Sequence, residues 1–259
     1  MQSAEPLRIQ EHRRYELLDS LRGLVLVGMI LFHTCWDLVY IFGIKWGWYK
    51  EAGAYIWQQS ICWSFILLSG FCWPLGKRHL KRGLLVLSAG GVISLITVVF
   101  MPENRVIFGV LTMLGTCTLI MIPLERLFRR IPSLAGFAVM VLLFVGTKNV
   151  NRGYLGFEEW NFFRLPQFLY RGGFMTFLGF PEPGFYSTDY FSLFPWLFLF
   201  LSGYFIYRMM KGKKDLLQKY FVDGFKPFSF LGKHSLSIYM AHQPLIFGLL
   251  FGMREFNIF

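Results

Sequence analysis

Ionisable residues lie within one long apolar segment near the start of the chain. Residues 18–38, LDSLRGLVLVGMILFHTCWDL, contain Arg22, His33 and Asp37. At 100° per residue, Arg22 and His33 fall within about 20° of one helix face and about 16 Å apart along the axis, and Asp37 follows one turn later. A carboxylate beside an imidazole fixes its tautomer and raises its basicity, as a general base requires. We therefore predict a polar track, with His33 and Asp37 at its chemical centre.

Each of these residues also has a structural interpretation. His33 can serve as a hydrogen-bonding residue between helices, and Asp37 can be solvated near the outer interface. Arg22 can extend its head group to the cytoplasmic interface. Ionisable residues at this depth are costly and usually face a protein interior or a wet cavity, which favours the chemical interpretation.

A second polar stripe is expected near the end of the chain, in LGKHSLSIYMAHQPL (231–245). Tyr239 and His242 share one helix face there, with Ser235 on the same face and Gln243 following. The stripe can line the same cavity as His33 and bind substrate, or it can hold helices together through hydrogen bonds. The sequence alone leaves both interpretations open.

These segments belong to a chain with the composition of an integral membrane protein. Of its 259 residues, 55% are hydrophobic and only 16% are charged, whereas about a quarter are charged in soluble domains. We expect an all-α, polytopic membrane helix bundle, with residues 1–259 forming one domain and 1–17 a cytoplasmic tail. Apolar blocks long enough to span a bilayer predict about seven transmembrane helices at 18–42, 55–75, 84–101, 106–124, 132–147, 190–209 and 232–252.

The basic residues of the chain predict its orientation. With a cytoplasmic N-terminus and seven alternating spans, 18 of the 26 Lys and Arg residues fall on the cytoplasmic side, as the positive-inside rule requires. The C-terminus then lies on the outer side. The protein as a whole is expected in the inner (cytoplasmic) membrane of the cell. Because topology explains the net charge of +11, no nucleic-acid partner is expected. The four cysteines show no metal-ligand spacing, so no metal site is predicted.

The longest non-spanning segment, 148–189, is predicted to be an outer loop of 42 residues. It mixes aromatic residues with Asn, Glu and Arg, including Glu159 and Trp160. This mixture can stack on and hydrogen-bond a sugar ring. The alternative is an interfacial loop whose aromatic side chains lie at headgroup depth.

A resemblance to a known family rests on several stretches in order along the chain. The Arg22–His33 pattern is accompanied by SFILLSGF (64–71), IFGVLTMLG (107–115), DYFSLFPWLFLFLSGY (189–204) and LGKHSLSIYMAHQP (231–244). Together they resemble the bacterial relatives of heparan-α-glucosaminide N-acetyltransferase, in the transmembrane acyltransferase superfamily. The resemblance implies transfer of an acetyl group from cytoplasmic acetyl-CoA, or another acyl-CoA, to a sugar or amino-sugar acceptor reached from outside. By position, it makes His33 catalytic, Arg22 part of the CoA site, and Asp37 and Asp189 polar supports near the acceptor.

Two departures from the family pattern limit this transfer of roles. Thr112 stands where relatives often have histidine, so no role is carried over there. The chain is also much shorter than the lysosomal enzyme, so the heparan substrate is not carried over. His33 would act either as a base on the acceptor or as a nucleophile that is itself acylated. Arg78, Arg82 and Arg129, from the basic links, are candidates to bind CoA phosphates, although topology also explains them.

Two other functions fit parts of the pattern. A proton-coupled transporter of a small solute would use buried His and Asp residues and often has repeated halves. WSFILLSG (63–70) and WLFLFLSG (196–203) echo each other in this way, although close helix packing at Ser-Gly is the simpler explanation. A receptor-like or purely structural seven-helix bundle predicts no polar track. Membrane lipid is an expected partner, and the outward-facing aromatic residues are compatible with a homodimer.

Overall fold

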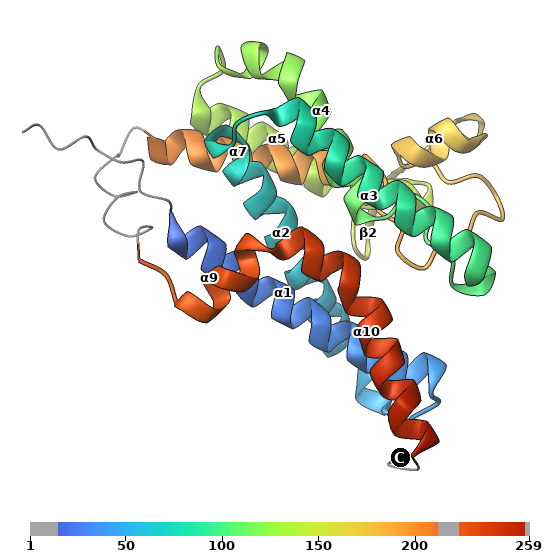
Figure 1. The fold of residues 1–259 in the computed structure, drawn as a ribbon. Helices are drawn as coiled ribbons and strands as arrows, with labels where there is room; N and C mark the ends of the chain where they lie inside the picture. The colour runs from blue at the N-terminus through green and yellow to red at the C-terminus, as the bar shows by residue number, and fades with distance from the viewer. Residues whose placement is uncertain (1–14, 212–222, 257–259) are drawn as a thin grey trace, which may run out of the picture.

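The computed structural model describes residues 15–211 and 223–256, in which long helices form two groups joined by one central helix (Figure 1). The first group packs around α1. In the second, α4 and α5 pack on α7 and α3 packs on α4, and α2 contacts both α1 and α7. The first group consists of α1 (Glu16–Trp36), α9 (Lys226–Lys233) and α10 (Ser235–Glu255). The second consists of α3 (His79–Phe100), α4 (Val110–Phe128), α5 (Ser133–Thr147) and α7 (Trp196–Lys211), and α2 is Ala52–Cys72.

Each of the seven predicted spans overlaps most of one of these helices. Five of the described helices are long and apolar enough to cross a membrane: Glu16–Ile41, His79–Phe100, Val110–Phe128, Ser133–Arg152 and Ser235–Glu255. The chain is therefore a multi-pass membrane protein. Helix α7 has only 16 residues, and α2 contains the polar pair Gln58–Gln59. The count of seven spans remains a prediction, and most of the predicted tail 1–17 lies outside the described residues.

The predicted outer loop 148–189 has secondary structure of its own. Two short strands are part of it, so the prediction of an all-α fold has to be corrected here. It contains a hairpin of β1 (Tyr154–Phe157) and β2 (Trp160–Arg164), the short helix α6 (Gly173–Leu178) and 3₁₀ turns at Val150–Arg152 and Gln167–Leu169. The strands are antiparallel and the register shifts at Gly156. A Cβ there would lie 2.0 Å from the carbonyl oxygen of Trp160, so only glycine fits. Figure 1 shows α6 and the hairpin together at one end of the bundle.

The two echoed Ser-Gly motifs pack against each other where α2 crosses α7. A Cβ on Gly70 would lie 1.8 Å from the carbonyl oxygen of Phe200, and one on Gly203 would lie 2.2 Å from that of Leu67. Small residues at such a crossing allow two membrane helices to approach closely. The packing interpretation of the echo is therefore confirmed. The main hydrophobic core forms around this crossing, on α2, α4, α5 and α7.

A similar pair of glycines joins α1 to α9, which the sequence did not predict as a separate helix. A Cβ on Gly23 would lie 1.9 Å from the carbonyl oxygen of Phe228, and one on Gly232 would lie 1.8 Å from that of Asp19. Lys233 also pairs with Glu16 at 3.6 Å. The predicted last span, 232–252, began inside α9. Helix α9 thus fixes the first turns of α1.

Candidate functional site

The centre of the candidate site is a pair of histidines at the contact between α1 and α10. The ring centroids of His33 and His242 are 5.0 Å apart, with the ring planes at 58°. The His242 side chain is buried, and its Nδ1 lies within hydrogen-bond distance of the Tyr239 carbonyl oxygen, at 2.5 Å. A carbonyl only accepts, so Nδ1 carries the proton, and Nε2 of the neutral ring is an acceptor. The structure therefore brings His33, His242 and Tyr239 together.

Asp37 belongs to the same place but has a different partner from the one predicted. Its carboxylate is completely buried, and its Oδ1 accepts a hydrogen bond of 2.9 Å from Nε2 of Gln243. The expected pairing with the His33 imidazole is not found among the described contacts. The reason is that α10 lies against this part of α1 and presents an amide donor directly to the carboxylate.

Three buried acceptor atoms at this site have no hydrogen-bond partner. They are Oδ2 of Asp37, Nε2 of His242 and Oε1 of Gln243; within the described residues, the other buried side-chain atom in this condition is Oγ of Ser229. Leaving such a group unsatisfied costs about 1–3 kcal/mol. Unsatisfied buried groups are rare in native proteins, and a catalytic or ligand-binding role is one of the explanations for them. All three accept hydrogen bonds, so a group that satisfies them has to be a donor.

Both helices depart from regular α-helical geometry at these residues. A π-helical segment, Asp37–Ile41, continues α1 directly, and such segments occur often at functional sites. Helix α10 contains Pro244 immediately after Gln243, and proline lacks the amide that would bond to the carbonyl four residues earlier. Only the proline was visible in the sequence. The buried acceptors therefore lie at two helix irregularities that face each other.

The predicted polar track from Arg22 to His33 is interrupted. Leu26 and Met29 lie between them on the same face of α1, and both are buried. Arg22 pairs with the buried Asp19 at 3.2 Å, one turn before it. The polar groups of α1 therefore form two clusters, one at Arg22 and one around His33, with apolar side chains between them. The prediction of a continuous track was wrong.

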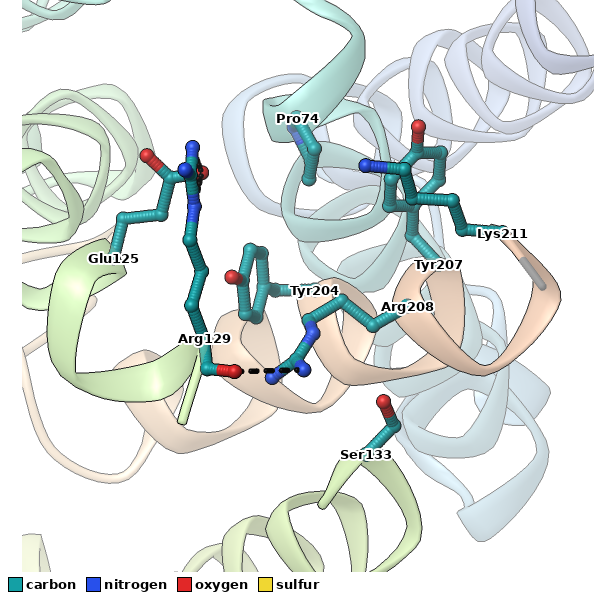
Figure 2. A pocket seen from close by; sticks show the side chains of 8 residues that line it. All are labelled: Pro74, Glu125, Arg129, Ser133, Tyr204, Tyr207, Arg208 and Lys211. Carbon is teal, nitrogen blue, oxygen red and sulfur yellow. Dashed lines mark hydrogen bonds and ion pairs between the residues drawn. The ribbon is translucent and has the colours of Figure 1, made fainter. Parts of the chain in front are cut away.

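The four predicted CoA-binding arginines are divided between two places. Arg82 lies close enough to Arg22 for their charges to repel, with Asp19 nearby. Arg78 is exposed at the start of α3, with a left-handed φ of 58°. Arg129 is instead paired with Glu125, with N···O distances of 3.0 and 2.7 Å. It lines a separate cavity shown in Figure 2.

Asp189 lies beside the start of α4, where its Oδ2 accepts a hydrogen bond of 3.5 Å from the backbone N–H of Val110. Desolvation raises the pKa of Asp189 to about 6, and the hydrogen bond from Val110 opposes this shift. The carboxylate is also close enough to Tyr239 to act on it electrostatically. Asp189 is therefore near Tyr239 of α10, and its role beside the acceptor stays a prediction.

The two predicted sugar-binding residues of the outer loop lie at the surface of the hairpin. Trp160 is 72% exposed, and Glu159 is also exposed. The inward contacts are made by Glu158, which the sequence did not single out. Its carboxylate accepts a hydrogen bond of 2.7 Å from Tyr55 and lies 3.7 Å from Nζ of Lys148. Glu158 therefore ties the hairpin to α2 and to the end of α5.

Comparison with known families identifies the family of the chain. A model of the catalytic domain of heparan-alpha-glucosaminide N-acetyltransferase matches residues 14–244. The chain belongs to this family. The matched range begins before α1 and ends at Pro244, so it contains the whole histidine site. No curated protein sequence and no solved structure matches the chain.

Membership in the family makes the chain an acetyltransferase-like membrane transferase. The structure also shows the surroundings of Thr112, the position at which the chain departs from its relatives. Thr112 lies at the crossing of α3 and α4, where its Oγ1 would be 2.6 Å from a Cβ on Gly90. This position is a packing contact here. The described residues contain no group of three or more His, Cys, Asp or Glu side chains that could hold a metal ion.

Proposed function

We propose that the protein transfers an acetyl group from acetyl-CoA, bound on the cytoplasmic side, to a saccharide reached from the outer side. The observation that carries this proposal is the set of three buried acceptor atoms beside His33, on Asp37, His242 and Gln243. Hydroxyl and amino groups of a sugar donate hydrogen bonds and would satisfy them. The thioester of CoA, which is the part of the donor that has to reach His33, is an acceptor and would not. Membership in the family supports the type of reaction.

In the proposed reaction, His33 acts where the two substrates meet. As the hydroxyl or amino group attacks the thioester carbonyl, its proton passes to His33, the new C–O or C–N bond forms and the C–S bond breaks. The CoA thiolate leaves and recovers the proton. An alternative order acetylates His33 first and transfers the group in a second step. In both, Asp37 and Gln243 position the acceptor and His242 accepts one of its hydrogen bonds.

The donor would enter at the other polar cluster of α1. Arg22 and Arg82, with Arg78 at the start of α3, would bind the phosphates of CoA. The pantetheine arm would then pass Leu26 and Met29 to cover the axial distance of about 16 Å to His33. The excess of Lys and Arg at this end of the helices supports a cytoplasmic position for the cluster, and with it the seven-span orientation. Asp189, Tyr239, Trp160 and Glu159 would contact the acceptor from the outer side.

The direct test is acetyl turnover by purified full-length protein. Radiolabelled acetyl-CoA and glycans extracted from the cell envelope are incubated with the parent chain, His33→Ala and His33→Asn. We expect both variants to lose at least about 100-fold in rate, the usual contribution of general acid–base catalysis. His234→Ala is the matched control, because His234 is an exposed histidine at the start of α10. Near-normal turnover by folded His33→Ala would disprove the catalytic role.

The transporter alternative loses one of its two supports. The echo of the two Trp-containing motifs was the sequence basis for repeated halves, and Gly70 and Gly203 account for that echo through helix packing. Uptake into proteoliposomes in the absence of acetyl-CoA would be the observation that restores it.

A further inference from the structure

A large cavity lies away from the two histidines, at the end of the bundle where α4 and α7 finish and α5 begins. Its volume is about 660 Å³, within the range of sites that bind small molecules. The residues around the cavity are labelled in Figure 2: Glu125 near the end of α4, Arg129 directly after it, Ser133 at the start of α5, Tyr204, Tyr207, Arg208 and Lys211 on α7, and Pro74 in the turn after α2. These residues give the cavity a positive and hydroxyl-rich wall.

The charges of this wall are not balanced. Within the described part of the chain, Glu125 is the only carboxylate that lines the cavity, and it is neutralised by the two hydrogen bonds from Arg129. Arg208 donates to the backbone carbonyls of Phe128, Ile131 and Arg129, which fixes its guanidinium without cancelling its charge. Lys211 adds a second positive charge. Among the residues that the structure describes, the wall therefore carries two positive charges without a carboxylate partner, beside three hydroxyl groups, which is suitable for binding a phosphate group.

The surroundings of the cavity separate it from the route to His33. The Tyr207 ring lies on the wall and packs edge-on against Phe71 of α2, with ring centroids 5.5 Å apart. Leu18 of α1 belongs to the same apolar cluster. This cluster stands between the cavity and the α1 helix that carries Arg22 and His33. A phosphate in the cavity is thus outside the proposed acyl-transfer path.

The outer surface next to the cavity indicates which phosphate would bind. Helix α5 begins at Ser133, and from the next residue it presents a row of exposed apolar side chains spaced four apart: Leu134, Ala138 and Leu142. Leu134 and Leu142 are each 70% exposed, and α5 lies within one of the candidate membrane spans. A lipid with its headgroup in the cavity can lay its acyl chains along this row, whereas a free phosphate compound makes no use of it.

We propose that this cavity binds the phosphate headgroup of an anionic membrane lipid. Arg208 and Lys211 hold the phosphate, the hydroxyls of Ser133, Tyr204 and Tyr207 donate to it, and the acyl chains follow α5. Basic pockets between transmembrane helices bind anionic headgroups in this way. The proposal is independent of the acetyl-transfer reaction, because it uses neither histidine and neither of the two α1 clusters.

The test measures lipid retention by the full-length protein in detergent. The protein is incubated with equal amounts of phosphatidylglycerol and phosphatidylcholine, and the bound lipids are counted by native mass spectrometry. We expect a clear preference for phosphatidylglycerol, and Lys211→Glu should weaken it by about 10-fold or more, since each cation near a bilayer surface contributes about fivefold. Lys77→Glu is the control, because Lys77 is an exposed cation in the α2–α3 link and does not line the cavity.

Three results would overturn the proposal. The first is equal retention of both lipids, and the second is an equal loss in Lys211→Glu and Lys77→Glu. The third is displacement of bound phosphatidylglycerol by CoA or inorganic phosphate at equal concentration, which would assign the cavity to a free phosphate compound. If Lys211→Glu does not fold, Arg129→Gln at an exposed position of the lining is the second variant. It should also weaken the preference for phosphatidylglycerol, because it leaves the Glu125 carboxylate in the wall without its cation. Arg130→Gln is its matched control.

Discussion

Replacing Asp37 with asparagine keeps the size of a buried side chain but removes its charge and one of its acceptors. In the parent chain, the carboxylate has one hydrogen bond, 2.9 Å from Gln243, while its own Oδ2 and Oε1 of Gln243 have none. An asparagine can keep the bond from Nε2 of Gln243 and donate its own N–H to Oε1. The two amides would then share two hydrogen bonds, and neither side chain would keep the unsatisfied acceptor that it has in the parent chain.

The expected gain follows from this count of hydrogen bonds. One additional buried hydrogen bond stabilises a protein by about 1 kcal/mol, and removal of an incompletely paired buried charge acts in the same direction. For a chain of this size, about 1 kcal/mol corresponds to a Tm increase of about 2–4 °C. Acetyl transfer should fall at the same time, by about 10-fold or more, because a charge-assisted hydrogen bond to the acceptor is replaced by a weaker neutral one.

Thermal unfolding in detergent and acetyl turnover, measured on the same preparation, test both parts. Gln243→Leu is the informative companion, because it leaves both oxygens of the buried carboxylate without a donor. It should lower the free energy of unfolding by about 1.5–3 kcal/mol. A lower Tm for Asp37→Asn would show that the carboxylate is fully satisfied in the folded chain. Unchanged turnover would show that Asp37 has no part in binding the acceptor.

Two further substitutions test the helix crossing and the outer carboxylate. Gly70→Ala should greatly reduce the yield of folded protein in fluorescence-detected size exclusion, since its Cβ would lie 1.8 Å from the Phe200 carbonyl oxygen; Gly91→Ala, with nothing within 4 Å, should be neutral or stabilising. For Asp189, the raised pKa of about 6 means that the folded state binds the proton more tightly than the unfolded state. Its contribution to stability is complete below about pH 4 and is lost as pH rises through about 6, so Asp189→Asn should reduce the fall in Tm between pH 4 and 8. An identical fall in both proteins would contradict the assignment.

The parts of the site that depend on helical periodicity could be predicted from the sequence. His33 and His242 each lie on the predicted polar face of an apolar helix, and the structure places the two faces together. The partner of Asp37 could not be predicted in this way. Gln243 is 206 residues away in the chain, and helical geometry within α1 says only that His33 and Asp37 are near each other. Which of two nearby groups the carboxylate binds depends on how α10 packs.

The hairpin was missed because its turn has no sequence signal. Two-residue hairpin loops usually contain Asn-Gly or Asp-Gly, whereas this one is formed by Glu158 and Glu159. Glu158 adopts a left-handed φ of 49°, which is uncommon for a residue with a Cβ. Its contacts with Tyr55 and Lys148 help to hold it there. The conformation is therefore determined by long-range contacts, and a choice between adjacent glutamates could not be made from the sequence.

The two irregular helices give the clearest link between fold and chemistry. Regular helices satisfy their own backbone groups and pack apolar faces together, as α2 and α7 do at Gly70 and Gly203. The π segment after Trp36 and Pro244 in α10 interrupt that regularity where Asp37 and Gln243 meet. Buried acceptors without partners are costly in a membrane, so a bundle selected for stability alone would replace them with apolar residues. Their presence at two facing irregularities, beside a histidine pair, is the physical reason to regard this place as the acceptor site.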